Sequence, residues 1–225
     1  MYFKLRFCNL CGFPIIRINK SVFGLRCIKC RSSFIHRALG KVITELNLSK
    51  DAIVHEFSNH GAIFNYLKNN FKNLTTSEYF DGIASGDFKD GVQCQDVQHL
   101  TLPHNHYNLM TSTEVFEHVP NDIKGFKNIY NCLKKGGYFA FTVPLTETEK
   151  TVERAILENG EIKHLLEPEY HGDHLRSKGI LAFRNYGFDI AERLKSVGFS
   201  DVKMPLIDDT KFAVEPAKRV IVAKK

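Results

Sequence analysis

Residues 107–144 read YNLMTSTEVFEHVPNDIKGFKNIYNCLKKGGYFAFTVP, and this stretch decides the fold of the chain. Two apolar runs at residues 107–113 and 138–143 predict buried strands, and the periodic apolar residues between them predict a helix. A strand, a helix and a second strand in this order indicate a β-α-β unit of a parallel α/β sheet. Ligands of such sheets bind beyond the carboxyl ends of the strands. The polar residues expected at that edge are Thr113, Glu114, Glu117 and His118.

Two further strand patterns precede this unit. Residues 52–57 (AIVHEF) predict the first strand, and residues 58–71 (SNHGAIFNYLKNNF) predict a turn and then an amphipathic helix. Residues 74–79 predict a second strand that ends in Glu78, roughly twenty residues after the first turn. An acidic residue there can accept hydrogen bonds from both hydroxyls of a ribose, as in dinucleotide-binding folds. The alternative is a solvent-exposed glutamate at the end of a strand.

A third strand is predicted over residues 92–97 (VQCQDV), after a loop rich in glycine and aspartate. Its last polar residue is Asp96, and an aspartate at such a position often caps a turn or a short helix, which is the alternative to a role in ligand binding. Later in the chain, residues 185–197 predict an amphipathic helix. Residues 201–207 and 219–223 predict the last two strands.

Four of the six cysteines lie in two C-x2-C pairs, Cys8 with Cys11 and Cys27 with Cys30. Each pair can direct two thiolates at one point, so the two pairs complete a tetrahedral zinc site with no open position. The start of the chain lacks the apolar run of an export signal, so a disulfide framework is not expected. We expect a structural zinc ribbon, and the alternative is a metal-free set of reduced cysteines.

The net charge of +6 is concentrated near the N-terminus. Nine basic residues precede the first acidic residue, Glu45, which leaves a net charge of −3 for the rest of the chain. A basic segment of this kind can attract nucleic acid or a phosphorylated substrate, and the alternative is a solvated face. No apolar run approaches the length of a membrane span, so we expect a cytoplasmic protein without membrane contact.

A set of short motifs resembles class I S-adenosylmethionine-dependent methyltransferases of the type 11-like kind: HEFSNHG, TSEYFD, CQDVQHL, TEVFEHVP, LKKGGYFAFTVP, EYHGD and LAFRNYG. The resemblance covers residues 52–225 and implies an α/β, Rossmann-like, seven-stranded sheet with an antiparallel edge hairpin. The short polar break at residues 47–51, after which strand character begins, predicts a boundary between a zinc ribbon with a linking helix at residues 1–48 and a methyltransferase domain at residues 49–225. In the family a helix usually follows the strand that ends near Pro144, so residues 145–178 are expected to form an inserted lid.

The resemblance also implies which residues bind the cofactor, S-adenosylmethionine. The family usually has three glycines in the turn after the first strand, where this chain has Gly61 alone. The cofactor-binding residues that it implies are Glu56, Ser58, Gly61, Glu78, Tyr79, Asp96, Val97, Thr113, Glu114 and Glu117. An ordinary strand-to-helix turn is the alternative for the first three of them.

The catalytic groups are expected in the lid and in the loop after residues 107–113. Methyl transfer to a hydroxyl or an amine requires removal of a proton, and an imidazole beside a carboxylate can serve as the base. The candidates are His118, His171 and Asp173, and the imidazoles of EYHGDH could instead bind a metal. A polar turn around Gly172 without a catalytic role is the alternative.

These features favour a methyltransferase for a small molecule, such as a sugar, a glycan precursor or another metabolite, because the lid is long enough to enclose a modest ligand. One alternative is an RNA methyltransferase that binds RNA through the basic zinc ribbon. Another is a non-catalytic methyltransferase-like binding module. The sequence contains neither a G-x-S-x-G motif nor a P-loop, so these routes to hydrolysis and nucleotide binding are not indicated.

Overall fold

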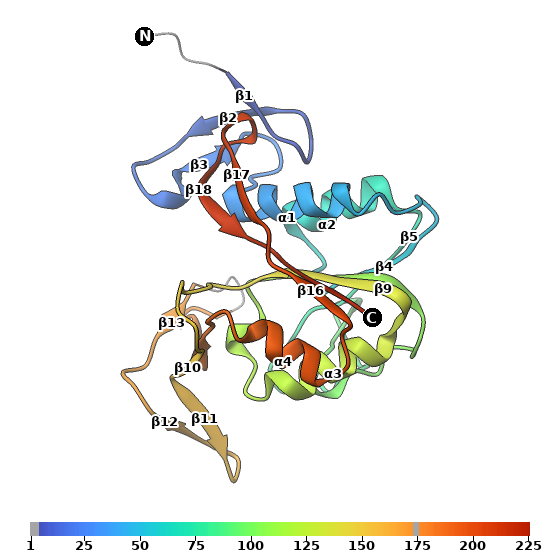
Figure 1. Ribbon diagram of the computed structural model, residues 1–225, viewed down its shortest axis with the longest axis vertical. Coiled ribbons are helices and arrows are strands. Elements are labelled where there is room, and N and C mark those ends of the chain that lie inside the picture. The colour runs from blue at the N-terminus through green and yellow to red at the C-terminus, as the bar shows by residue number, and fades with distance from the viewer. Residues whose placement is uncertain (1–4, 173–175) are drawn as a thin grey trace.

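The computed structural model describes residues 5–172 and 176–225, and its centre is a mixed β-sheet (Figure 1). The strands follow the order β16, β19, β9, β8, β4 and β5 across the sheet. Their bounds, in that order, are Asp201–Lys203, Ile221–Lys224, Leu133–Thr142, Tyr107–Thr113, Ile53–Glu56 and Asn73–Thr76. The neighbours among β5, β4, β8 and β9 are parallel, whereas β19 and β16 pair antiparallel. The predicted α/β class and the β-α-β unit are confirmed.

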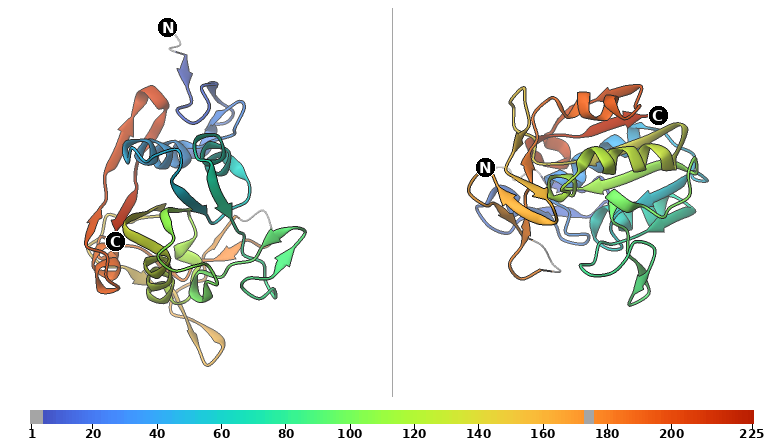
Figure 2. Two further views of the ribbon diagram at one scale, coloured as in Figure 1. Left: turned by 90° about the vertical axis from the view of Figure 1, so that its right-hand side faces the viewer. Right: turned by 90° about the horizontal axis from the view of Figure 1, so that it is seen from below.

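Within the described residues this sheet has six strands, not the seven that were expected. The missing strand is the one predicted over residues 92–97. Its first part, β7 (Val92–Gln93), pairs with β6 (Phe88–Lys89) in a separate hairpin, which projects from the sheet edge in both views of Figure 2. A single parallel bridge, Glu78 to Cys94, marks the place of the seventh strand. The prediction was too long because the glycine-rich loop before Val92 folds back and takes over the backbone hydrogen bonds of this segment.

Two helices cover each face of the sheet (Figure 1). They are α1 (Phe34–Glu45) and α2 (Gly61–Asn70) on one face, and α3 (Asp122–Cys132) and α4 (Ile190–Ser196) on the other. Successive residues of a strand point to opposite faces, so Leu109 packs with the first pair and Met110 with the second. The helix α3 begins where the Asn121 side chain accepts a hydrogen bond from the backbone N–H of Lys124, at 3.0 Å.

The N-terminal segment forms a small three-stranded sheet that carries the cysteines. Its strands are β1 (Arg6–Phe7), β2 (Pro14–Arg17) and β3 (Leu25–Cys27), and α1 follows directly. One continuous hydrophobic cluster contains Cys8 and Leu10 of this segment together with Leu109 and Ala140 of the central sheet. The segment before residue 48 and the sheet therefore share a core across the boundary that the sequence predicts.

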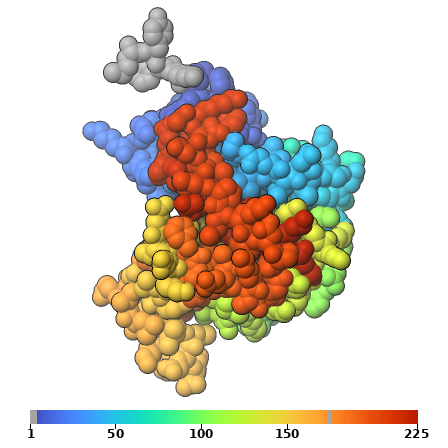
Figure 3. Space-filling view, in the orientation of Figure 1, coloured from blue at the N-terminus to red at the C-terminus, as the bar shows by residue number. Residues whose placement is uncertain are grey.

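A hairpin from the far end of the chain also reaches the N-terminal segment. It consists of β17 (Leu206–Asp209) and β18 (Val214–Arg219), lies between the edge strands β16 and β19 in sequence, and covers the segment in Figure 3. Arg6 and Glu215 form an ion pair at 2.9 Å, and Lys41 pairs with Asp209 at 3.2 Å. The strand predicted over residues 201–207 is thus divided into β16 and β17, and the strand predicted over residues 219–223 corresponds mainly to β19.

The insertion after β9 consists of short antiparallel strands and extends away from the sheet (Figure 1). Its strands are β10 (Val152–Glu153), β11 (Ala155–Glu158), β12 (Glu161–His164) and β13 (Tyr170–His171). The partners of β13 and β10 are β14 (Ile180–Leu181) and β15 (Arg184–Asn185), so the predicted lid returns to the main domain as a set of paired strands. Among the described helices, none combines the length and the apolar character that crossing a membrane requires.

Candidate active site

The strand β4 places Glu56 below the turn that is predicted to bind the cofactor. Glu56 is 2% exposed, and the hydroxyl of Thr111 on β8 donates a hydrogen bond to its Oε2. Burial raises the pKa of Glu56 to about 8, so the carboxyl group is protonated at neutral pH. Glu56 therefore links two strands in the interior, and its contact with a cofactor stays a prediction.

Replacing Glu56 by glutamine should remove a pH dependence of stability. A native pKa near 8 and an ordinary value near 4.5 in the unfolded chain mean that the native state binds the proton more tightly between these two pH values. The free energy of unfolding of the wild type should fall as pH rises through this window, by at most about 1.4 kcal/mol per pH unit, relative to Glu56→Gln. Urea unfolding of both proteins at pH 6 and pH 8 measures the difference, and an equal pH dependence of the two would contradict the prediction.

The turn after β4 brings three of the predicted cofactor residues together. At its end Gly61 begins α2 with φ +89°, a left-handed conformation that strains other residues, and the space beyond its Cα is open. Within the turn Ser58 Oγ lies 3.4 Å, and His60 Nδ1 3.5 Å, from Oε2 of Glu78. Because β4 and β5 are parallel neighbours, their carboxyl ends share one edge, and Glu78 faces the turn as the ribose prediction requires.

The substitution Glu78→Ala should weaken binding of S-adenosylhomocysteine about 10- to 100-fold. The carboxylate of Glu78 is predicted to accept hydrogen bonds from both ribose hydroxyls. Charge-assisted hydrogen bonds of this kind contribute about 1.5–3 kcal/mol to the free energy of binding. Titration calorimetry of the variant and of Glu161→Ala, an exposed control on β12, measures the effect. If both variants bind the nucleoside as the wild type does, Glu78 has no such role.

Asp96 and Val97 follow Cys94, whose backbone pairs with that of Glu78. Asp96 caps the 3-10 turn Val97–His99, where its Oδ1 accepts from the backbone N–H of Gln98 at 2.8 Å and its Oδ2 lies 3.0 Å from His99 Nδ1. The capping interpretation is therefore confirmed, and a contact of Asp96 with the cofactor stays a prediction. The side chain of Val97 is buried in the core, so this residue can offer a ligand only its backbone.

Tyr79 connects the cofactor edge with the insertion. Its ring is partly exposed, and the guanidinium of Arg176 lies 5.6 Å from the ring centroid. Arg176 also forms an ion pair with Asp81 at 2.7 Å. The insertion is thereby held over the strand end at which Glu78 and Tyr79 lie.

Thr113 and Glu114 end β8 and begin the loop after it. Glu114 has a left-handed backbone with φ +52°, and its N–H donates to the carbonyl of Thr142 on β9 at 2.9 Å. Its carboxylate pairs with Lys218 of β18 at 3.0 Å. Among the described residues, the buried hydroxyl of Thr113 has no hydrogen-bond partner. Thr113 and Glu114 therefore lie at the expected edge of the sheet, at the end of β8. The ion pair between Glu114 and Lys218 was not predicted from the sequence.

The loop after β8 and the insertion meet in a compact group of Glu117, His118 and His171, which we call the Glu-His-His cluster. Oε1 of Glu117 lies 3.6 Å from Nε2 of His118 and 3.7 Å from Nδ1 of His171. The two imidazole rings meet edge to face with their centroids 4.9 Å apart. The glutamate is completely buried, and the side chains of His118 and His171 are 8% and 27% exposed. Two of the three predicted catalytic residues are therefore brought together, and Asp173 lies outside the described residues.

The surroundings of Glu117 and His171 raise the pKa values of both groups, so that the cluster holds a proton near neutral pH. Burial raises the pKa of Glu117 to about 7. The neighbouring carboxylate of Glu117 raises the pKa of His171 to about 8, with Glu169 adding to the effect. Both groups therefore titrate in the range in which a general base works best.

Groups outside the predicted set hold the two histidines in place. Nδ1 of His118 lies 2.8 Å from the carbonyl oxygen of Leu181, and Nε2 of His171 lies 3.1 Å from Oε1 of Glu169. Glu169 belongs to the same EYHGDH motif as His171, so the high density of polar residues in this motif was a sequence signal for Glu169. The Leu181 carbonyl has no signature in the sequence, because any residue type supplies a backbone oxygen.

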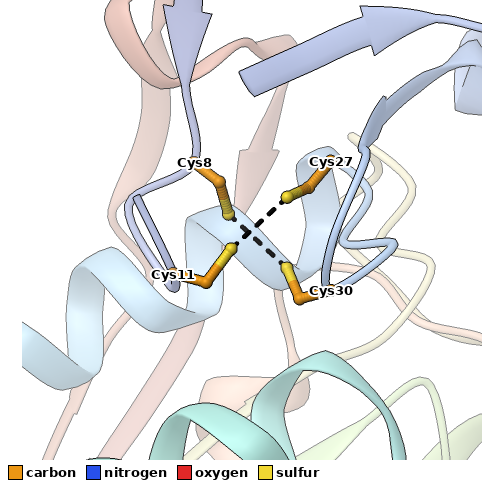
Figure 4. Close-up of side chains that lie close together, drawn as sticks. All are labelled: Cys8, Cys11, Cys27 and Cys30. Atoms are coloured by element: carbon orange, nitrogen blue, oxygen red, sulfur yellow. Dashed lines mark hydrogen bonds between the residues drawn. The ribbon is translucent and has the colours of Figure 1, made fainter. Parts of the chain in front are cut away.

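The four paired cysteines converge on one point (Figure 4). Sγ of Cys8 lies 3.7 Å from that of Cys30, and Sγ of Cys11 lies 3.4 Å from that of Cys27. Four sulfurs at about 2.3 Å from a tetrahedral zinc ion are about 3.8 Å apart, and a disulfide would need about 2.05 Å. The donor set and its spacing fit a structural Zn²⁺, and the site leaves no open position for a substrate.

A buried arginine lies beside the cysteines. Arg37 of α1 is fully buried and donates hydrogen bonds to the carbonyl oxygens of Ser32 at 2.6 Å, Leu25 at 3.2 Å and Ala213 at 2.8 Å. Ser32 Oγ in turn lies 3.2 Å from Sγ of Cys8. A guanidinium at this depth offsets the negative charge that four thiolates bring, and it ties the cysteine segment to the β17–β18 hairpin.

Comparison with known proteins agrees with this architecture. A family described as "Methyltransferase domain" matches residues 43–203. An S-adenosylmethionine-dependent methyltransferase from Mesorhizobium loti shares the fold, with a TM-score of 0.53, 12% identity, and coverage of 82% of this chain and 96% of that one. So does a 1,6-didemethyltoxoflavin-N1-methyltransferase from Burkholderia thailandensis, solved with 1,6-didemethyltoxoflavin and S-adenosylhomocysteine, with a TM-score of 0.53, 15% identity, and coverage of 85% and 78%.

A search among curated proteins finds no match to the chain. At the identities above, likeness to solved structures shows a common fold alone. The family match, however, extends over well over half of the sequence and includes the turn after β4, the strand end with Glu78 and all three residues of the Glu-His-His cluster. The chain belongs to the methyltransferase-domain family.

Proposed function

We propose that the protein transfers a methyl group from S-adenosylmethionine to a small molecule, and that the Glu-His-His cluster forms the acceptor side of the site. The observation that carries this proposal is the cluster itself, because a buried carboxylate and two imidazoles meet beyond the end of β8. The predicted cofactor residues Ser58, Gly61 and Glu78 lie at the same edge of the sheet. When bound, S-adenosylmethionine supplies an activated methyl group on a sulfonium centre.

The residues of the chain have three tasks in this proposal. Glu78 and the turn at Gly61 hold the nucleoside and the amino-acid part of the cofactor. His171 takes the proton from the acceptor, because its raised pKa keeps it a strong enough base and the insertion leaves it partly exposed. Glu117 stabilises the imidazolium that results.

The acceptor is proposed to be a small molecule because the insertion approaches the cluster closely. His171 of β13 reaches Glu117, and Arg176 of the same insertion reaches Tyr79 and Asp81, so the insertion lies over the edge of the sheet at which the predicted site residues lie. Arg154 is paired with Glu169 at 3.2 Å and Arg176 with Asp81, so neither favours an anionic acceptor. The B. thailandensis enzyme of the same fold binds a small heterocycle, 1,6-didemethyltoxoflavin.

A calorimetric titration of the zinc-loaded protein with S-adenosylhomocysteine tests the first half of the proposal. We expect one binding site per chain. Release of S-adenosylhomocysteine from S-adenosylmethionine in the presence of pooled sugars, glycan precursors and other hydroxylated metabolites then tests the second half. A protein that does not bind the nucleoside at all is a binding module and not an enzyme.

One observation favours RNA as a second candidate acceptor. Phe7, Phe13 and Phe23 are each more than 40% exposed on the N-terminal segment, among exposed basic residues, and Lys29 Nζ lies 4.3 Å from the ring centroid of Phe13. Aromatic faces beside positive charges can stack bases and neutralise phosphates. Gel-shift measurements with single-stranded RNA at 50 and 200 mM salt test this candidate, which requires binding that weakens steeply with salt.

A further inference from the structure

We propose that Glu117, His118 and His171 bind a divalent transition-metal ion, at a second metal site separate from the four cysteines. The three residues come from the loop after β8 and from β13, and together they offer one carboxylate oxygen and two imidazole nitrogens. These three ligand atoms all lie within 4.8 Å of one another. Two ligands at about 2.1 Å from one ion are at most about 4.2 Å apart, so a small inward movement of the side chains completes the site.

Each histidine is oriented in the way that metal-binding histidines usually are. Such a histidine uses one ring nitrogen for the metal and gives the hydrogen of the other to a carbonyl or a carboxylate. In His118, Nδ1 faces the carbonyl of Leu181 and Nε2 faces Glu117. In His171, Nε2 faces the carboxylate of Glu169 and Nδ1 faces Glu117. Both rings thus turn one nitrogen toward the same point and anchor the other outside it.

The carboxylate of Glu117 gives an independent reason to expect a cation. Glu117 is completely buried, and among the described residues neither of its oxygens accepts a hydrogen bond. The two imidazole nitrogens lie 3.6 and 3.7 Å away, which is beyond hydrogen-bonding distance. A buried carboxylate without hydrogen bonds is costly unless a positive charge compensates it, and an ion between these three atoms would satisfy it.

The ligand types select the class of ion. Two imidazoles with one carboxylate suit zinc, iron(II), cobalt or a similar transition metal, whereas magnesium and calcium prefer sites made of oxygen atoms. Three protein ligands also leave a position open for another oxygen ligand, which a closed four-cysteine site does not. The two sites in one chain would therefore differ in kind, one structural and one open to small molecules.

This inference does not rest on the proposed function, since metal binding can be measured without methyl transfer. It does change how the cluster would act, because an imidazole that ligates a metal cannot take up a proton. In the metal-bound protein, the ion would lower the pKa of an oxygen ligand, and the imidazoles would hold the ion.

Cobalt(II) is the probe for this site. Zinc-loaded protein, cleared of loosely bound metal by brief treatment with EDTA, is titrated with Co²⁺ and followed by visible absorption. We expect one equivalent to bind with weak bands typical of nitrogen and oxygen ligands, and without the intense thiolate-to-cobalt absorption that would report replacement of zinc at the cysteines. His118→Ala and His171→Ala should each weaken cobalt binding at least about 10-fold, and Glu169→Gln should weaken it about 10-fold or more through His171.

The control is His164→Ala, which removes an exposed histidine from β12 of the same insertion and should leave cobalt binding unchanged. Thermal unfolding of each variant verifies that it is folded, and the side chain of His171 is 27% exposed. The proposal is overturned if the His118→Ala and His171→Ala double variant binds cobalt as tightly as the wild type. It is also overturned if the wild type binds no cobalt outside the cysteines.

Discussion

Replacing His171 by alanine is expected to lower kcat for methyl transfer about 100- to 10,000-fold, the usual contribution of a general base. In wild-type protein the rate should increase with pH as His171 loses its proton, because its pKa is raised to about 8 and only the neutral imidazole can accept a proton. The variant should lose this rising limb. Its affinity for S-adenosylhomocysteine should change little, because Ser58, Gly61 and Glu78 hold the cofactor in our proposal.

The measurement is the pH profile of kcat for the wild type, His171→Ala and the control His164→Ala, with an acceptor found by the screen described above. The assays are run after treatment with EDTA and again with added Co²⁺ or Zn²⁺. A loss of the rising limb in metal-free protein identifies His171 as the base. Activity of the wild type that depends on added metal, and is lost in the variant, identifies His171 as a metal ligand. Unchanged kcat in the variant under both conditions contradicts a catalytic role of either kind.

Replacing Cys8 by alanine is expected to release zinc and to destabilise the native protein by several kcal/mol, since structural zinc sites in small domains contribute on the order of 10 kcal/mol to folding. Cys8 is buried in the same hydrophobic cluster as Leu39 of α1 and Leu109 of the central sheet. Loss of the zinc should therefore destabilise more than the N-terminal segment, because it also loosens the packing of α1 on the central sheet. The midpoint of thermal unfolding should fall by about 10 °C or more.

The matched control is Cys94→Ala, which also removes a buried cysteine but one outside the cluster of four. It should keep its zinc and lose only the small amount of stability that belongs to a side-chain truncation in the core. Bound zinc is measured by elemental analysis and stability by urea unfolding. A Cys8→Ala protein that lacks zinc and unfolds at the wild-type urea concentration would show that the metal has no structural role.

Most of the architecture could be predicted from the sequence, because hydrophobic periodicity reports local structure. The strand over residues 107–113 was predicted with its observed bounds, and a helix follows it as predicted. The spacing of Cys8, Cys11, Cys27 and Cys30 predicted their convergence, because C-x2-C turns direct both thiol groups locally. One exception was the third strand, where a glycine-rich loop formed its own hairpin in place of a longer pairing beside β5. Another was the strand predicted over residues 201–207, which is divided into β16 and β17.

The candidate site could be predicted only in part. Glu117 and His118 are neighbours in the sequence, and the polar motif around His171 was visible. No local sequence pattern, however, predicts that the two segments meet. The meeting depends on the pairing of β13 with β14, which aligns His171 with Ile180 and brings the Leu181 carbonyl to His118. Likewise, Thr111 against Glu56 and Lys218 against Glu114 are contacts between strands far apart in the chain.

The sequence by itself determined the α/β class, the succession of the main strands along the chain, the cysteine cluster and the edge of the sheet at which the predicted site residues lie. These features follow from periodicity, turn chemistry and short spacings, which act over a few residues. The tertiary structure alone decided that Arg37 lies buried beside the cysteines, that the β17–β18 hairpin packs on the N-terminal segment, and that a glutamate and two histidines face one another. Long-range packing fixes these contacts, because their energy comes from burial of charge and apolar surface between segments that the sequence keeps apart.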